Sequence, residues 1–462
     1  MRLTFDLEAN GLRDTVTCVH CLVIRDVDTG DVFTYIPSEI DKGVAQLQEC
    51  LDNGGQIIGH NIIDYDIPVL RDLHNLHVSY EQQTQCVDTL VMSRVIYSNL
   101  KDTDFSYMRR GILPGVLLGS HSLKAWGLRL GELKGDYGVT TDDAWETFSQ
   151  EMLDYCVQDV NVTTRLFKKL SEENLPEDVL ITELKAMWLM TKQKELGFPF
   201  DVEKARELER TLRARKATLQ TKLLALVPRI PDKIFIPKRN NKTKGYIKGV
   251  PIQRYKDFNP NSRQQIEWVF STYFKYEPDN PDLYEEDRLK IDENTLTFVS
   301  QDPLAPQELQ EVAATFSEYL MLSKRLGQLI DGKYGWLKVV NEADKCIHGS
   351  VNPCGAITGR ATHSSPNVAQ VPAINSPYGA ECRELFKAQE GWYQAGIDAS
   401  GLELRCLAHY LYPYDEGAYA HEILNGDIHT ANMKAAGLTE RNQAKTFNTM
   451  EVYKTIEFGE PL

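Results

Sequence analysis

The sequence lacks long hydrophobic runs and paired cysteines. No apolar segment approaches the roughly 18 residues that a membrane-spanning helix needs. The first residues, MRLTFDLEANGL, carry acids at once, so we expect no secretory signal peptide. The nine cysteines are scattered, which suits reduced thiols, and we expect a cytoplasmic protein. Cys18 and Cys21 form a C-x-x-C in an alternating stretch and are interpreted as strand thiols rather than zinc ligands.

Positive charge is also scarce. The chain has 51 Lys and Arg against 66 Asp and Glu, a formal net charge of −15. This balance argues against a nonspecific nucleic-acid coat, which needs clustered Lys and Arg. It does not exclude a DNA enzyme, because such enzymes hold metals with carboxylates and confine positive charge to one groove. The 462 residues, 42% of them hydrophobic, predict a globular chain of two or three domains.

The first ~170 residues read as an α/β domain. Residues 3–7, 17–25 and 32–36 have strand patterns, and helical stretches follow from about residue 42. The first strand ends in Asp6-Leu7-Glu8, and residues two apart on a strand point to the same face. Two adjacent acids repel each other unless a cation lies between them. A solvent-facing strand end is the alternative interpretation.

Two further segments carry acids in a related pattern. IIGHNIIDYDIPVL contains Asn61, Asp64 and Asp66, and the predicted helix EMLDYCVQDVNVTTRLFKKL places Tyr155 and Asp159 on one face. The order D-x-E, N-x4-D, Y-x3-D resembles the DEDD exonucleases of the tyrosine branch. The resemblance implies hydrolysis of single-stranded DNA 3′ ends.

This resemblance also implies a metal site. Two Mg²⁺ ions, which Mn²⁺ can replace, would be held by Asp6, Glu8, Asp66 and Asp159, with Tyr155 orienting the attacking water. Asp64 is interpreted as a surface acid. Asn61 and Glu8 are also expected to touch the sugar of the terminal nucleotide.

Residues 173–345 are expected to form a mainly helical thumb. Lys324 and Arg325 lie near the end of a predicted helix, where they either cap a core helix or contact DNA. A basic loop near 233–248 is interpreted either as solvated or as a contact to the DNA backbone. The segment is short for an inserted domain, so the recruitment of a processivity partner is left open.

From residue 346 the motifs resemble family A DNA polymerases of short-tailed bacteriophages. They include NPCGAITGRATHSSPNVAQVP, GWYQAGIDASGLELR and NGDIHTANMKAAGLTERNQAKTF. Asp398 ends a predicted apolar strand, and the resemblance makes it a polymerase metal ligand. The resemblance also implies that Glu403 helps to discriminate deoxyribose from ribose. It implies primer–template contacts for Arg360, Asn367 and Gln370. It implies contacts with the phosphates of the incoming nucleotide for His429, Arg441 and Lys445.

After these motifs, the sequence departs from the family pattern. Thr449 stands where the family has a tyrosine, and no later His-Asp-Glu motif supplies the second metal aspartate. We therefore expect that DNA synthesis needs a separately encoded C-terminal fragment, as from a split or intron-interrupted gene. A free-standing 3′→5′ exonuclease and an inactive DNA-binding fragment are the alternatives.

The predicted architecture is α/β plus α+β and multidomain. It comprises a ribonuclease H-like exonuclease domain (1–172), a helical thumb (173–345), an incomplete palm with the start of the fingers (346–447) and a divergent tail (448–462).

Overall fold

The computed structural model describes residues 1–132, 137, 144–427, 430, 433–434 and 437. The chain divides into two compact units, Met1–Gln389 and Glu390–Leu462, and each is considered by itself. Among the described residues, none of the helices combines the length and the apolar character that crossing a bilayer requires.

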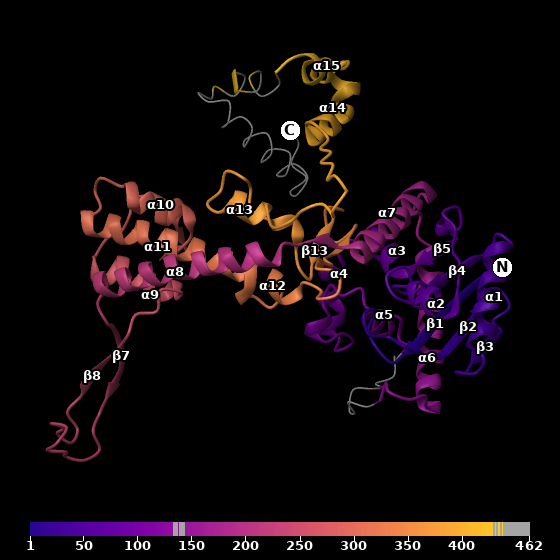
Figure 1. Cartoon of the computed structure of the whole chain (residues 1–462), viewed down its shortest axis with the longest axis horizontal. Helices are drawn as coiled ribbons and strands as arrows, with labels where there is room; N and C mark the ends of the chain where they lie inside the picture. The colour runs from indigo at the N-terminus through magenta and orange to yellow at the C-terminus, as the bar shows by residue number, and fades with distance from the viewer. Residues whose placement is uncertain (133–136, 138–143, 428–429, 431–432, 435–436, 438–462) are drawn as a thin grey trace. The chain divides into compact units, whose positions relative to one another are not determined.

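The first unit begins with a five-stranded mixed sheet (Figure 1). Its strand order is β3-β2-β1-β4-β5. The three N-terminal strands pair antiparallel, whereas β1–β4 and β4–β5 are parallel. The strands are β1 (Arg2–Ala9), β2 (Val19–Asp26), β3 (Val32–Tyr35), β4 (Gln56–Gly59) and β5 (Cys86–Asp88). The three strand patterns predicted near the N-terminus are therefore confirmed.

Helices cover both faces of this sheet. Side chains alternate along β1, so Phe5 and its neighbours at odd positions pack into the core that includes α1. The even positions face α6: the Thr4 and Thr164 hydroxyls lie 2.6 Å apart, and the Cys156 thiol donates to the Asp6 carbonyl at 3.3 Å. The helices of this part are α1 (Ile40–Asp52), α2 (Asp66–His74), α3 (Thr89–Ile96), α4 (Leu100–Arg109), α5 (Leu123–Leu130) and α6 (Gln150–Ser171).

Helix α7 (Glu177–Leu196) follows the charged junction but packs on the same core. Leu184 and Met187 are buried with the residues of the sheet. The Trp188 indole donates to the Gln83 carbonyl at 3.1 Å. The sequence placed this helix with the thumb, because its apolar spacing does not reveal which core it joins.

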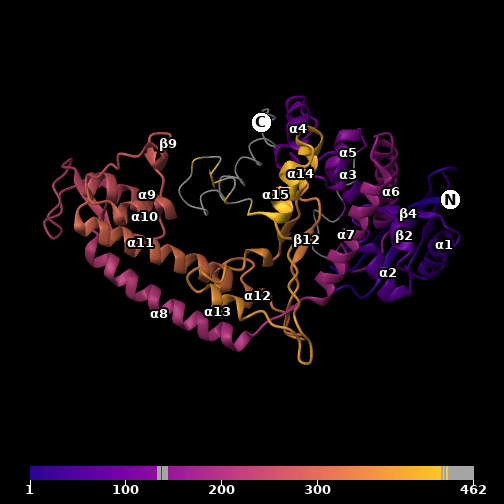
Figure 2. The same cartoon turned by 90° about the horizontal axis from the view of Figure 1, so that it is seen from above.

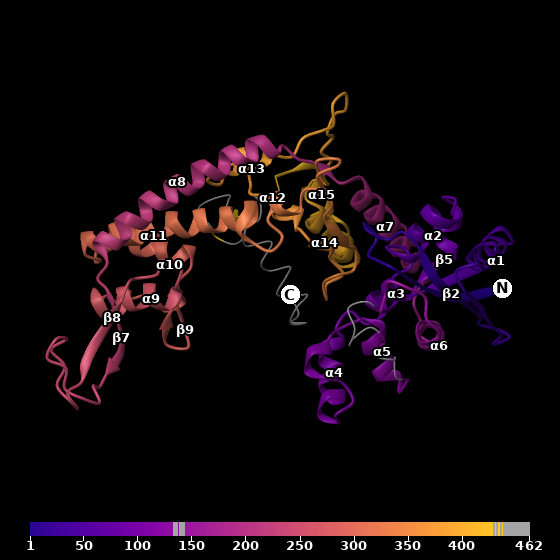
Figure 3. The same ribbon diagram turned by 60° about the horizontal axis from the view of Figure 1, so that its bottom comes forward.

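The next part of the first unit is helical and contains one long hairpin. Helices α8 and α11 run alongside each other (Figure 2), with Leu212, Val312 and Phe316 buried between elements of this core. The bounds are α8 (Val202–Leu226), β7 (Ile230–Phe235), β8 (Ile252–Lys256), α9 (Arg263–Trp268), β9 (Tyr284–Glu285), β10 (Arg288–Leu289), α10 (Glu293–Gln301), α11 (Gln307–Leu326) and α12 (Trp336–Val339). The basic loop predicted near 233–248 lies mostly in the connection between β7 and β8, which pair as a hairpin (Figure 3).

Short strands close the first unit. β6 (Phe198–Pro199) pairs with β11 (Cys346–Ile347), and β12 (Ser350–Asn352) pairs with β13 (Thr362–Ser364). Phe200, Trp336 and Phe386 pack their rings together with centroids 5.2 to 6.3 Å apart. This aromatic cluster ties residues 346–386, which include α13 (Gly379–Arg383), to the start of α8. The second unit contains α14 (Leu402–Asp415) and α15 (Ala418–Asn425).

Candidate active site

Strand β1 delivers two carboxylates to the face covered by α6. Asp6 pairs with Val23 and Glu8 with Cys21 in the β1–β2 register. Both acids are half-buried. The register shifts directly after Glu8, where the strand pairing becomes irregular. The regular alternation up to that point brings the two side chains together, as the sequence predicted.

Asp66 enters the site from the first turn of α2. It is 4% exposed, and its position at the helix N-terminus is one where the backbone dipole favours a negative charge. Burial nevertheless raises the pKa of this carboxyl well above its usual range, and the nearby Asp88 raises it further. A cation beside Asp66 would offset this cost, because it stabilises the ionised form.

Helix α6 contributes Tyr155 and Asp159, one turn apart. Asp159 is buried and Tyr155 is half-buried. The Tyr155 ring packs beside Tyr137 and Trp145, with centroids 5.8 and 6.2 Å away. These rings hold Tyr155 in place beside the carboxylates.

One cavity of about 190 Å³ gathers all five residues (the acidic cavity). Its lining comprises Asp6, Leu7, Glu8, His60, Asn61, Tyr65, Asp66, Trp145, Tyr155 and Asp159. Burial, and then the charges of Asp66, Glu8 and Asp6, raise the pKa of the Tyr65 hydroxyl to about 12. Burial is the larger cause of this shift, and the three carboxylates add to it.

The donor set of the acidic cavity suits a hard divalent cation. Carboxylate oxygens are the ligands that Mg²⁺ prefers. Potential ligand atoms of Asp6, Glu8 and Cys156 lie within 4.8 Å of one another. Burial raises the pKa of the Cys156 thiol well above its usual range, and this thiol donates to the Asp6 carbonyl. The Cys156 thiol is thus used in a hydrogen bond, whereas the carboxylates offer the oxygen ligands that Mg²⁺ prefers.

Asp64 lies outside the acidic cavity. Its carboxylate pairs with the Lys194 ammonium at 2.8 Å and lines a different pocket. The structure thus separates Asp64 from Asp66, which the sequence alone placed only two residues apart.

Sequence reasoning missed Asp88, which holds the loop before Asp66. Its Oδ1 accepts the Asn61 and Leu90 backbone N–H groups at 2.9 Å each, and its Oδ2 accepts that of Ile63 at 3.2 Å. Asn61 has a φ of 67°, a left-handed conformation that needs such support. An Asp followed by Thr and an apolar helix was a recognisable cap signal, but its link to residues 61–63 depends on the fold.

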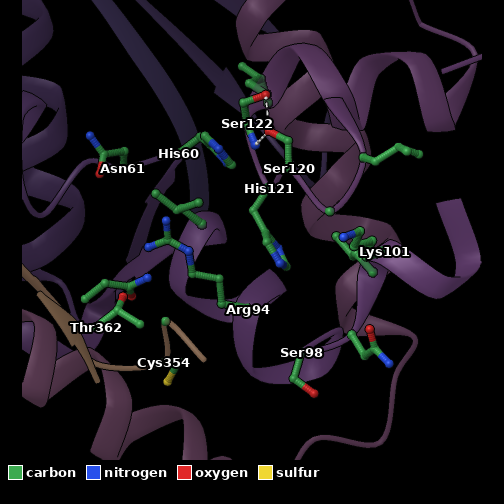
Figure 4. A pocket seen from close by; sticks show the side chains of 18 of the residues that line it. His60, Asn61, Arg94, Ser98, Lys101, Ser120, His121, Ser122, Cys354 and Thr362 are labelled. Atoms are coloured by element: carbon green, nitrogen blue, oxygen red, sulfur yellow. Dashed lines mark hydrogen bonds between the residues drawn. The ribbon is translucent and has the colours of Figure 1, made fainter. Parts of the chain in front are cut away.

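A wider groove of about 930 Å³ adjoins the acidic cavity. The two share Asp6, His60, Asn61 and Asp159. Figure 4 shows Arg94 and His121 in the middle of the opening, with Lys101 on one side and Cys354 and Thr362 on the other. The groove therefore joins the sheet domain to residues 352–362 of the same unit.

The electrostatics of this groove differ from those of the acidic cavity. Burial, and then the charges of Arg94 and Arg129, lower the pKa of His121 to about 4, so its ring is neutral near pH 7. Arg94 and Lys101 thus supply the positive charge of the lining.

The predicted thumb contacts have different environments. Lys324 is exposed in the last turn of α11. Arg325 is 8% exposed, and its guanidinium donates to the Pro377 carbonyl at 3.2 Å and to Gln328 and Ser376. The expected DNA contact of Arg325 is therefore corrected: this side chain is buried and links α11 to residues 376–377.

Residues expected at the primer–template lie after β12. Arg360 is exposed and precedes β13. Asn367 precedes the short helix Val368–Gln370, and the Gln370 carbonyl accepts from the Gln328 side chain at 3.0 Å. The structure leaves these assignments as predictions.

The second unit differs from the sequence expectation at Asp398. Residues 391–400 are exposed and irregular, with Ile397 97% exposed, so the buried strand expected to end at Asp398 is not formed. The reason is that no strand of the described residues pairs with this segment. Glu403 is in the first turn of α14, as the predicted helix requires. His429, Arg441 and Lys445 lie outside the described residues, as does Thr449.

Comparison with known families covers both halves of the chain. A model described as RNase H superfamily matches residues 3–171, which contain the acidic cavity. A model described as DNA polymerase family A matches residues 240–459.

Individual relatives extend this similarity along the chain. The DNA-directed DNA polymerase of Escherichia phage T7 is 39% identical over 534 aligned positions, covering 96% of this chain and 74% of the relative. That of Enterobacteria phage T3 is 38% identical over 538 positions, with the same coverage. Both alignments are longer than the 462 residues of this chain, so the relatives contain inserted segments that it lacks.

A solved structure shares the fold. The POL domain of Pol1 from M. smegmatis, in complex with DNA primer-template and dNTP, superposes with a TM-score of 0.62 at 16% identity, covering 96% of this chain and 67% of that one. Taken with the phage relatives and the two family matches, the chain belongs to DNA polymerase family A and carries an RNase H-like domain.

Proposed function

We propose that the acidic cavity hydrolyses the 3′-terminal phosphodiester of a DNA strand and so serves as a 3′→5′ exonuclease. One observation carries this proposal: Asp6, Glu8, Asp66, Asp159 and Tyr155, from a strand and two helices, line a single cavity. Acids with only a structural role have no reason to converge, because buried like charges repel each other.

The carboxylates would hold two Mg²⁺ ions, and Mn²⁺ could replace them. DNA polymerases and RNase H-like nucleases generally use divalent metal ions. When bound, Mg²⁺ supplies a Lewis acid that activates water and stabilises the charge on the leaving 3′ oxygen. Asp6 and Glu8 are positioned by the paired strand β1, and Asp66 by the loop that Asp88 holds.

The remaining residues would position the DNA and the water. The Tyr155 hydroxyl would orient the attacking water, since its ring is fixed between Tyr137 and Trp145. Asn61 and Glu8 would contact the terminal sugar. Arg94 and Lys101, in the adjoining groove, would neutralise phosphates of the entering strand.

A labelled-strand assay tests the exonuclease. A 5′-labelled single strand is incubated with Mg²⁺ and wild-type protein, with an Asp6→Ala, Glu8→Ala double variant, or with Asp64→Ala as the matched control. We expect stepwise shortening by the wild type and by Asp64→Ala, because Asp64 pairs with Lys194 outside the cavity. Equal shortening by the double variant, or none by folded wild type, would refute the proposal.

We also propose that the polymerase part binds primer–template and dNTP. The family match to residues 240–459 and the phage relatives favour this second function. Lys324, Arg360, Asn367 and Gln370 would contact DNA, Asp398 would hold a metal ion, and the nucleotide would be bound by Glu403, His429, Arg441 and Lys445. A shift of a labelled primer–template that the next complementary dNTP strengthens would support this function, and its absence would oppose it.

Synthesis by this chain alone is a separate question. Nucleotidyl transfer needs two aspartates, and Asp398 would be one of them. Adding all four dNTPs to the primer–template with wild-type protein and with Asp398→Asn tests this role: extension by the wild type alone would support it, and equal extension by both would refute it.

A further inference from the structure

Two segments that carry carboxylates of the acidic cavity contact each other outside it. Glu8 lies near the end of β1 and is followed by residues 10–18, which connect β1 to β2 and which we call the Glu8 loop. Asp66 begins α2. The Tyr65 hydroxyl, directly before α2, donates to the Gly11 carbonyl of the Glu8 loop at 2.6 Å. The positions of the Glu8 loop and of α2 are therefore linked.

An ion-pair network joins both segments to Glu195, in the last turn of α7. The Glu195 carboxylate accepts from the Arg71 guanidinium of α2 at 2.8 and 3.4 Å. It also accepts from Arg13 of the Glu8 loop at 3.3 Å. Arg13 pairs in addition with Asp72 of α2, to which Arg71 donates at 2.8 Å. Glu195 is thus the point at which the Glu8 loop, α2 and α7 are connected.

The end of α7 is fixed from its other side by residues 346–348. His348 Nδ1 donates to the Lys194 carbonyl at 2.7 Å. The next residue after α7 is Gly197, whose φ is 67° and at which a Cβ would lie 2.8 Å from both Cys346 and His348. Residues 346–348 belong to the range that matches DNA polymerase family A. Glu195 therefore lies where the RNase H-like domain meets the polymerase part.

The network affects position more than stability. Its four side chains are 22% to 46% exposed, and ion pairs between partly exposed groups contribute little to stability. Residues 10–18 are all exposed or half-buried, so the Glu8 loop depends on its polar contacts. A displacement of about 1 Å in a catalytic group can nevertheless cost about 100-fold in rate. Loss of Glu195 should therefore affect the site more than the fold.

We infer that Glu195 is a positioning residue for the acidic cavity, which fixes the Glu8 loop and α2 so that Glu8 and Asp66 hold metal ions in the geometry that hydrolysis needs. This inference rests on the proposed function, in which these carboxylates bind Mg²⁺. Glu195 lines a different pocket from the acidic cavity, so it acts through Arg13 and Arg71 and not on the metal itself.

The neighbouring residue Lys194 provides a matched control in the same helical turn. Its ammonium pairs with Asp64 at 2.8 Å, and both side chains are about as exposed as that of Glu195. Asp64 lies in the turn before α2 that Asp88 already holds through the Asn61 and Ile63 backbone. Loss of the Lys194 pair should therefore leave the acidic cavity unchanged.

Metal binding by the full chain tests the inference. Wild type, Glu195→Ala and Lys194→Ala are titrated with Mn²⁺ by isothermal titration calorimetry. The Asp6→Ala, Glu8→Ala variant reports the Mn²⁺ that binds outside the acidic cavity. The Tm and the single-turnover degradation of a 5′-labelled single strand are measured on the same samples.

The expected effect is a loss of metal affinity without a comparable loss of stability. Substituting a residue that supports metal ligands from outside the site typically costs about 10- to 100-fold in metal affinity or activity. Glu195 acts through other side chains, so we expect the lower end: Mn²⁺ binding about 10-fold weaker and degradation about 10-fold slower. Lys194→Ala should behave as wild type. Unchanged Mn²⁺ affinity in Glu195→Ala, with or without a lower Tm, would overturn the inference, as would an equal loss in Lys194→Ala.

A second set of variants tests the route through the two arginines. In an Arg13→Ala, Arg71→Ala background, the partners of Glu195 are already absent. Adding Glu195→Ala should then weaken Mn²⁺ binding no further, because residues that act through one network do not have additive effects. A further loss of about 10-fold would show that Glu195 acts by another route and would overturn the inference.

The same measurements separate this inference from the proposed function. If wild type and Glu195→Ala bind Mn²⁺ and degrade the strand equally, the positioning role is wrong and the exonuclease stands. If Glu195→Ala binds Mn²⁺ more weakly but wild type degrades no strand, the exonuclease proposal fails and the positioning of a metal site is supported. If wild type binds no more Mn²⁺ than the Asp6→Ala, Glu8→Ala variant, both are wrong.

Discussion

The loop that carries Asp66 into the acidic cavity depends on one buried carboxylate, and Asp88→Asn tests this dependence. The amide keeps one oxygen for the N–H groups of Asn61 and Leu90. It places an NH₂ group where Oδ2 accepts the Ile63 N–H. One buried donor then loses its partner, which costs about 1–3 kcal/mol.

The cost of Asp88→Asn translates into a melting shift. In a domain of this size, 1 kcal/mol shifts Tm by about 2–4 °C, so the range is about 2–12 °C. Burial raises the pKa of Asp88, which means that its ionised form is costly in the folded protein. A neutral amide recovers part of that cost, and we therefore expect the lower half of the range.

Activity should fall more than stability. A displacement of about 1 Å in a catalytic group can cost about 100-fold in rate, so we expect a 10- to 100-fold loss of exonuclease rate. The assay is single-turnover degradation of a 5′-labelled single strand at saturating Mg²⁺, with Tm measured on the same samples. Asp64→Asn is the control, because it loses only a half-exposed ion pair worth about 0–1 kcal/mol. A wild-type rate in Asp88→Asn, with or without a Tm change, would refute the positioning role.

Three other substitutions have distinct expected outcomes. Tyr155→Phe should lower the exonuclease rate about 100-fold while it keeps the ring contacts of Tyr155; a single-turnover assay that finds the full rate would exclude the water-orienting hydroxyl. Asp104→Ala should destabilise the protein by about 3–5 kcal/mol, because it strands Arg129, whose side chain is 4% exposed and bonds to Asp104 at 2.8 Å; a Tm like that of wild type would contradict this. The folded-state pKa of His121 is depressed to about 4, so its contribution to stability is present above pH 6.5 and lost as the pH falls toward 4. As the pH is lowered, the Tm of His121→Gln should therefore fall less steeply than that of wild type. Parallel curves of Tm against pH would argue against the shift.

The sequence predicted the elements of the acidic cavity because the relevant patterns are local. The alternation of β1 placed Asp6 and Glu8 on one face, and the helical spacing of Tyr155 and Asp159 placed them on one side of α6. The prediction of an RNase H-like α/β domain is confirmed by the family match and the mixed sheet. The membership of DNA polymerase family A is confirmed in the same way.

Contacts between distant segments were not predictable from those patterns. The Asp88 carboxylate accepts a backbone N–H from a residue 25 positions earlier, and the buried Arg325 guanidinium donates to a carbonyl 52 residues later. Both depend on tertiary packing that no local period encodes. The predicted strand before Asp398 has the right apolar pattern, but a strand also needs a neighbour, and none of the described residues provides one.

The basic loop was recognised by its composition, and its residues after Phe235 lie in the connection between β7 and β8. Two short runs with strand propensity flank a long polar tip, and the pairing of Asn241 with Tyr246 closes it. The sequence shows the charge directly, whereas the register that turns the loop into a hairpin appears only in the structure.

The central claim is that four carboxylates form one metal site, and anomalous diffraction from a crystal of this protein grown with Mn²⁺ tests it most directly. We expect anomalous peaks in the acidic cavity, bounded by Asp6, Glu8, Asp66 and Asp159. The Asp6→Ala, Glu8→Ala variant should lose them, and Asp64→Ala should retain them. An ordered cavity without a peak, or a peak unaffected by the double substitution, would contradict the account.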